Sequence, residues 1–157
     1  MVRGDGNGWI RCEQGHRHWG VHGAAGLLLR RRGGSGSATA SRGDVVLLQH
    51  RASWTSDGDT WGLPGGARDS HESPVQAALR EAGEEAGIDP AAVQVAGEWP
   101  DDHGGWVYVT VIAEVIGPLS IAPNAESAEL RWVVEPDVET FALHPGFART
   151  WPLLRYR

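Results

Sequence analysis

Short apolar runs alternate along this chain with stretches rich in glycine and polar residues. The runs are of strand length, and the later ones are enriched in β-branched and aromatic residues, which is typical of strands packed on a core. We therefore predict strands at residues 23–31, 45–52, 92–99, 106–116 and 130–134. Residues 33–43 predict a flexible hairpin loop, and Gly104 with Gly105 predicts a turn. The closing segment 146–157 has mixed helical spacing and predicts a short helix on the sheet.

One segment carries clear helix signals at both ends. Ser73 can cap the first turn, Pro74 needs no amide hydrogen there, and Gln76 follows three residues after the cap. Gly87 predicts the end of the helix. Helical periodicity places one apolar arc against a sheet, formed by Val75, Ala78, Leu79, Ala82 and Ala86. Strands on both sides of such a helix favour an α/β sandwich with a mixed central sheet.

Length and composition limit what the chain can do. Its 157 residues correspond to one domain, which we place at 18–157 behind an extension, 1–17, that is either flexible or an edge strand. The formal charge of -6 disfavours a nucleic-acid polymer or a membrane surface as partner. All basic residues are Arg, which excludes lysine-based catalysis, and a lone Cys12 excludes an intrachain disulfide. With no apolar leader, we expect a cytoplasmic protein.

Three glutamates cluster on the predicted helix. Glu81, Glu84 and Glu85 have i, i+3, i+4 spacing, so their carboxylates share one strip beside the apolar arc. Their mutual repulsion disfavours the helix unless a cation binds there. Hard divalent cations such as Mg²⁺ or Mn²⁺ prefer such oxygen ligands. Ala77, one turn earlier, is expected to leave room on that strip for a phosphate or for water bound to the metal.

The residues around these glutamates resemble a known signature. From Gly66 to Ile88 the chain has Gly, five residues, Glu, seven residues, Arg-Glu, an aliphatic, any residue, Glu-Glu, any residue, Gly and an aliphatic, and WGLPGG precedes it. This pattern is similar to the Nudix box of MutT-like hydrolases. The resemblance implies a Nudix-type α/β/α sandwich. It also implies that metal ions bind Glu81, Glu84, Glu85 and the Gly65 carbonyl, with Arg80 and Glu72 orienting the carboxylates.

The resemblance also implies a catalytic base, supplied either by the box or by an acid on a later loop. Within the box, Glu84 and Glu85 are the catalytic carboxylates that we single out, with Arg80 beside them. On the later loop, Glu126 and Glu129 are candidates, and we favour Glu126. For substrate binding we single out Arg30 as a phosphate contact, Trp61 and Trp106 as stacking surfaces, and Glu129.

We therefore expect a metal-dependent pyrophosphohydrolase that uses Mg²⁺ or Mn²⁺. The expected substrate is a small nucleotide, either a (d)NTP or an oxidised (d)NTP, cleaved to NMP and pyrophosphate. The alternatives are an ADP-ribose or nucleotide-sugar pyrophosphatase and, in a different class, a non-catalytic nucleotide-sensing module. The expected oligomeric state is a monomer or a homodimer.

Overall fold

The computed structural model describes residues 4–33 and 43–155. The predicted loop 33–43 therefore lies mostly outside the described residues. Within the described residues, two α-helices and two short 3-10 helices accompany the strands. The strands are β1 (Trp9–Arg11), β2 (Arg17–Trp19), β3 (Ala24–Arg31), β4 (Val45–Arg51), β5 (Trp61–Gly62), β6 (Gly65–Ala67), β7 (Val93–Asp102), β8 (Val107–Val115) and β9 (Ser127–Val134).

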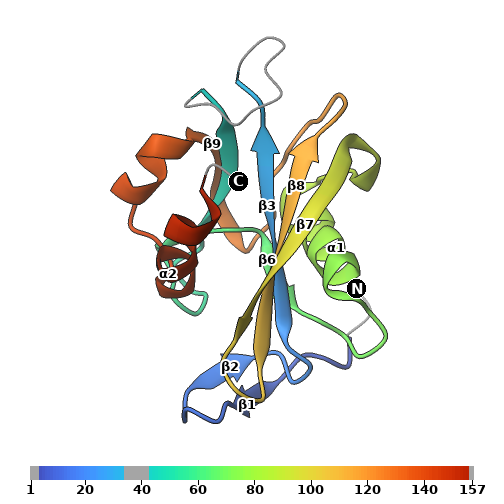
Figure 1. Ribbon diagram of the computed structural model, residues 1–157, viewed down its shortest axis with the longest axis vertical. Helices are drawn as coiled ribbons and strands as arrows, with labels where there is room; N and C mark the ends of the chain where they lie inside the picture. The colour runs from blue at the N-terminus through green and yellow to red at the C-terminus, as the bar shows by residue number, and fades with distance from the viewer. Residues whose placement is uncertain (1–3, 34–42, 156–157) are drawn as a thin grey trace.

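Within residues 4–33 and 43–155, seven strands form one mixed sheet in the order β5-β4-β3-β8-β7, with β6 paired to β3 and β9 paired to β4. β3 and β8 run parallel, and the other pairs are antiparallel. Two strands pair antiparallel with different parts of β3. Its first residues pair with β6, whereas Arg30 and Arg31 pair with β4. This split leaves β6 beside the middle of the sheet (Figure 1), where it contacts the helix that carries the glutamates.

The five predicted strands are confirmed, with shifts at their ends. β7 continues to Asp102 because its polar residues still pair with β8, and Gly104 and Gly105 turn the chain with φ angles of 76° and 78°. β9 begins at Ser127, three residues before the predicted start, because Ser127 to Glu129 pair with the end of β4. The short strands β5 and β6 were not predicted, since they lie in a glycine-rich segment with little strand character.

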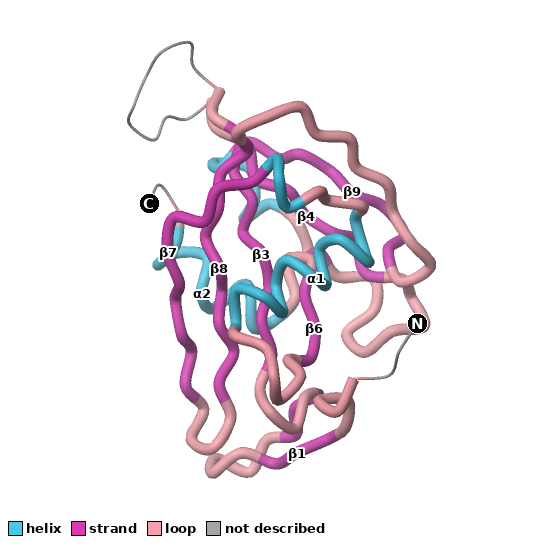
Figure 2. The backbone as a smooth tube through the Cα atoms, turned by 90° about the vertical axis from the view of Figure 1, so that its right-hand side faces the viewer, coloured by secondary structure: helices cyan, strands magenta, loops and turns pink. Residues whose placement is uncertain are grey.

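Helix α1 (Pro74–Ala86) confirms the predicted helix and its capping box, with Ser73 and Gln76 bonding reciprocally and Gly87 left-handed at φ 69°. It lies across one face of the sheet (Figure 2), packing on Leu27, Leu47 and Val111. The expectation that Ala77 leaves room on the glutamate strip is wrong. Ala77 is fully buried, because β6 covers a second side of the helix and widens its buried arc.

Helix α2 (Pro145–Leu154) covers the other face of the sheet, where Phe147, Trp151 and Leu154 pack on Leu28 and Leu48. With the helices on opposite faces, the chain is an α/β sandwich with a mixed central sheet, as the sequence predicts (Figure 1). Among the described residues, no helix combines the length and the apolar character needed to cross a membrane.

The N-terminal segment forms a structure of its own. β1 and β2 make a two-stranded antiparallel sheet in which Trp9 faces Trp19. β2 begins at Arg17, so this hairpin extends across the expected boundary between 17 and 18. Trp106 lies between β7 and β8. Its indole N–H donates to the Gly20 carbonyl at 2.9 Å, and this bond links the hairpin to the main sheet.

Candidate active site

The glutamates of α1 gather where the helix passes over β6. Glu85 is buried with 5% of its surface exposed. Its Oε2 atom accepts a hydrogen bond of 2.9 Å from the Gly65 amide and one of 3.3 Å from the Gln49 side chain. Gly65, the first residue of β6, therefore lies next to the Glu85 carboxylate.

Glu81 reaches the neighbouring glycine. A Cβ atom at Gly66 would stand 2.7 Å from the carboxyl carbon of Glu81, so the carboxyl group occupies the space that a side chain would fill. Gly66 does not have a positive φ angle. A side chain at position 66 would collide with the Glu81 carboxyl group, and this contact accounts for the glycine. Glu81 and Glu85 thus lie against β6, with Glu84 on the same strip of the helix, and carboxylate and carbonyl oxygens are the donors that hard divalent cations prefer.

The electrostatics of the cluster favour a cation. Burial raises the pKa of Glu85 to about 9, with contributions from the charges of Glu81 and Glu126. Burial likewise raises the pKa of Glu81 to about 7, while Arg80 opposes the rise and Glu84 adds to it. With raised pKa values, these carboxyl groups ionise less readily when no cation is bound. Because they lie close together, they fit a site in which a metal ion supplies the missing positive charge.

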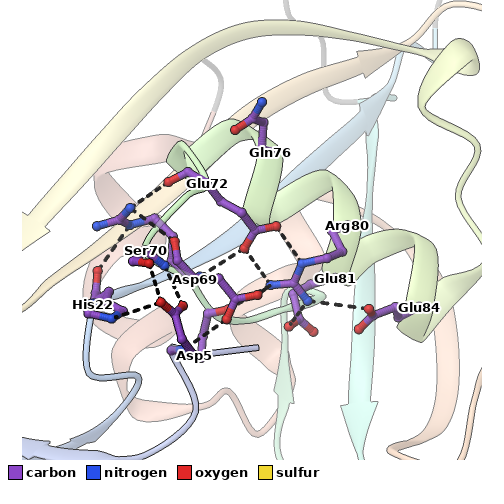
Figure 3. Close-up of polar contacts among 12 residues, drawn as sticks. Asp5, His22, Asp69, Ser70, Glu72, Gln76, Arg80, Glu81 and Glu84 are labelled. Carbon is purple, nitrogen blue, oxygen red and sulfur yellow. Dashed lines mark hydrogen bonds and ion pairs between the residues drawn. The ribbon is translucent and has the colours of Figure 1, made fainter. Parts of the chain in front are cut away.

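Arg80 organises the acids around it (Figure 3). Its Nε and Nη2 atoms donate to the two carboxylate oxygens of Glu72 at 2.6 and 2.9 Å, and Nη1 donates to Glu81 at 3.0 Å. Nη2 also donates to the Ala67 carbonyl at 3.0 Å, at the end of β6. The pairing lowers the pKa of Glu72 and raises that of Arg80. Arg80 therefore links the start of the helix, its glutamate strip and β6.

A histidine and two acids form a smaller group at the start of α1. Asp69, His71 and Glu72 have potential ligand atoms within 4.8 Å of one another. The Asp69 carboxylate accepts from the Gly6 amide at 2.9 Å, and that of Glu72 is paired with Arg80. These bonds indicate that the group braces the helix start.

The loop before β9 carries Glu126 to the cluster. The Glu126 carboxyl group lies close enough to that of Glu85 to raise the pKa of Glu85 further. Glu126 is nevertheless exposed and open to water. Glu129 lies elsewhere: its cross-strand partner is His50, on the α2 side of the sheet, and its carboxylate pairs with Arg131 at 2.7 Å. The structure thus brings Glu126 to the box glutamates and leaves Glu129 on the opposite face.

The expectation that Arg30 contacts a phosphate is wrong. Its side chain is 1% exposed and pairs with the buried Glu135 at 2.6 Å. This partner lies 105 residues along the chain, in the 3-10 helix Glu135–Thr140 that follows β9. Arg30 therefore anchors that segment to β3 inside the core.

The two tryptophans singled out for stacking are both packed. Trp106 is 8% exposed and stacks on His18 at 3.9 Å, although it borders a hollow of about 610 Å³ at the start of α1. Trp61 stacks on His50 at 4.7 Å, with the guanidinium of Arg131 over its ring. Neither ring lies at the glutamate cluster, since Trp61 belongs to the core on the α2 side. In this structure both rings are therefore packed against other side chains.

Sequence reasoning missed Gln49, Asn124 and Ser127. Gln49 bridges the Glu85 carboxylate and the Ser127 hydroxyl, which is 2.7 Å from its side-chain nitrogen. Asn124 donates to the Glu84 carbonyl at 3.1 Å. A buried amide at the polar end of an otherwise apolar strand, VVLLQ, was the available signal for Gln49.

Comparisons with known proteins agree with this geometry. Residues 21–155 match the model of the NUDIX domain family. A Mycobacterium tuberculosis protein, provisionally named 8-oxo-dGTP diphosphatase 3, is 51% identical over 161 residues, covering 99% of this chain and 71% of the relative. The crystal structure of a Nudix hydrolase from M. smegmatis is 50% identical and superposes with a TM-score of 0.85, covering 96% of this chain and 93% of that one.

A more distant solved structure shows the fold alone. A C. elegans Ap4A hydrolase is 22% identical, with a TM-score of 0.63, and the match covers 84% of this chain and 93% of that one. The family match over most of the chain and the identity to the mycobacterial proteins go further than fold. Together with the intact box, they show that this chain belongs to the Nudix hydrolase family.

Proposed function

We propose that this Nudix hydrolase is a Mg²⁺- or Mn²⁺-dependent nucleoside triphosphate pyrophosphohydrolase that acts on a (d)NTP or an oxidised (d)NTP. Its products are then NMP and pyrophosphate. The observation that carries the proposal is that Glu81 and Glu85 lie against β6 and that Glu126 adjoins Glu85. The name of the Mycobacterium tuberculosis relative supports an oxidised purine nucleotide as substrate.

The residues present fit divalent cations. Glu81, Glu84, Glu85 and the Gly65 carbonyl would hold them, since all are oxygen donors on α1 or on the strand β6 that it contacts. The bound ions neutralise phosphate charge and lower the pKa of a coordinated water. Arg80 keeps the Glu81 carboxylate oriented through a hydrogen bond of 3.0 Å. The amides of Gly65 and Gln49 do the same for Glu85.

Glu126 has the position required of a general base. Its carboxyl group adjoins that of Glu85, and its exposure gives water access to it. In the proposed reaction, Glu126 accepts a proton from the water that attacks phosphorus. A well-placed base of this kind contributes about 10²–10⁴-fold to the rate. Glu129 does not adjoin Glu85, because it is paired with Arg131 on the other face of the sheet.

A substrate panel tests this function. Purified protein is incubated with dNTPs, 8-oxo-dGTP, ADP-ribose and nucleotide sugars, with Mg²⁺ or Mn²⁺, and the products are separated by chromatography. We expect NMP and pyrophosphate from the triphosphates, complete loss of activity in EDTA, and recovery when metal is added back.

The other functions correspond to other outcomes of the panel. Turnover of ADP-ribose or a nucleotide sugar to NMP and a sugar phosphate, at a kcat/KM above that for any triphosphate, would replace the proposal with the pyrophosphatase alternative. Binding of a nucleotide without turnover would indicate the nucleotide-sensing module. Full activity in chelator would exclude the metal-dependent chemistry.

A further inference from the structure

The C-terminal end of α1 is closed by the loop 122–127. The last carbonyl groups of a helix have no donor within the helix. At this end, the Ala86 carbonyl accepts from the Ala122 amide at 2.8 Å, and the Glu85 carbonyl accepts from the Asn124 amide at 3.2 Å. The Glu84 carbonyl accepts from the Asn124 side chain at 3.1 Å. The loop therefore serves as the cap of the helix that carries the metal-binding glutamates.

Asn124 makes a hydrogen bond with each of its polar groups. Besides the two bonds to the helix, its side-chain oxygen accepts from the Glu126 amide at 2.9 Å, and its carbonyl accepts from the Ser127 amide at 3.1 Å. The same side chain thus holds the helix with its nitrogen and Glu126 with its oxygen. An asparagine amide offers a donor and an acceptor on adjacent atoms, and an aspartate would offer no donor.

We propose that Asn124 is a positioning residue that fixes Glu126 against the end of α1, so that the Glu126 carboxyl group meets Glu85. Asn124 touches neither carboxylate, and it acts through the backbone on both sides. A displacement of about 1 Å at a reacting group costs on the order of 10²-fold in rate. The bonds of Asn124 therefore control turnover more than substrate affinity.

This inference rests on the proposed function, in which Glu126 is the base. The test compares Asn124→Ala and Asn124→Asp, each alone and in the Glu126→Gln background, using kcat and KM for the best nucleotide of the panel. Asp102→Ala is the matched control, because the Asp102 carboxylate accepts from the Gly104 amide at 2.8 Å in a similar two-residue turn, between β7 and β8.

We expect both single variants at Asn124 to lower kcat by about tenfold or more, with KM changed by less than about threefold. Asn124→Asp retains the acceptor for Glu126 but loses the donor to the helix, and it adds a negative charge at the negative end of α1. In the Glu126→Gln background, neither change should lower kcat further, because the base is already absent. Asp102→Ala should keep the kcat of the unmodified protein.

The possible failures are distinguishable. If Glu126→Gln is impaired while both Asn124 variants keep full kcat, the role of Asn124 is wrong and the proposed function stands. Additive losses in the double variants would also overturn it, since Asn124 would then act on something other than Glu126. If Glu126→Gln itself keeps full activity, the assignment of the base fails and this inference fails with it. Should Asn124→Ala not fold, Asn124→Asp decides the question.

Discussion

Arg80 donates two hydrogen bonds to Glu72, which lies eight residues earlier, before the first turn of the same helix (Figure 3). The pair is bidentate, an arrangement in which a guanidinium group fixes the orientation of a carboxylate. Another nitrogen of Arg80 donates to Glu81. By holding Arg80, Glu72 therefore helps to fix the position of the Glu81 carboxylate. The box arginine therefore acts through geometry as well as through charge.

Arg80→Lys should separate these two contributions. Lysine keeps the positive charge but cannot donate in a fork to Glu72 and also reach Glu81. We expect a loss of about 10–100-fold in activity or metal affinity, which is typical when a group that orients metal ligands is removed. Titration of activity with Mg²⁺ measures both. If Arg80→Lys matches the unmodified protein in both, the charge of Arg80 alone is sufficient.

Glu85→Gln should separate folding from catalysis. The amide preserves the size of the side chain but removes a metal ligand, so turnover should fall by at least about 10²-fold. In EDTA the thermal stability should stay level or rise, because a buried carboxyl group with a raised pKa is replaced by a neutral one. Glu98→Gln, at an exposed position on β7, is the control. Loss of folding in Glu85→Gln would instead indicate a structural role.

The metal-free protein should become less stable as the pH rises. Folding raises the pKa of Glu81 from 4.5 to about 7 and that of Glu85 from 4.5 to about 9. The folded state thus holds more protons than the unfolded state above about pH 4.5. The contribution of these two groups to stability is fully present below that pH and is lost up to about pH 9, by at most about 1.4 kcal/mol per pH unit and proton.

Thermal unfolding in EDTA at several pH values measures this dependence. Mg²⁺ should reduce the loss, because it stabilises the ionised carboxylates, and Glu85→Gln in EDTA should show a shallower slope. The buried cluster would have no role in the pH dependence if the melting temperature in EDTA rose steadily from pH 6 to pH 9 in both proteins.

Two further variants separate the candidate bases. Glu126→Gln should lower kcat by roughly 10²-fold or more with little change in metal affinity, and Glu129→Gln should behave almost like the unmodified protein. The physical reason is position, since Glu126 adjoins Glu85 and Glu129 is held by Arg131. Rate profiles from neutral to alkaline pH provide the measurement. If both variants keep normal turnover, the base is one of the helix glutamates.

Features set by local sequence could be predicted. The capping residues Ser73 and Gln76 fix the start of α1, and the spacing of Glu81, Glu84 and Glu85 places them together whatever the fold around them. The strands followed from runs of apolar residues. In each case the information lies within a few neighbouring positions.

Features that depend on distant pairing could not be predicted. Arg30 belongs to a run of three arginines that is typical of a solvated strand end, and its partner Glu135 reaches it only once β9 has paired with β4. Ala77 is buried because β6 lies beside β3, a contact that a helical wheel does not contain. Gln49 likewise gains its role from Glu85, which packs on it from another element.

The two glycines under the glutamates differ in how they tolerate mutation. At Gly65 a Cβ atom would stand 2.5 Å from the carbonyl oxygen of Ala25, so any side chain would push β6 off the sheet. At Gly66 the obstacle is the movable carboxyl end of Glu81. Gly66→Ala should therefore give a well-expressed protein with a displaced Glu81 carboxylate and weak metal binding. Selection for abundance alone would accept that substitution, and selection for nucleotide turnover would remove it.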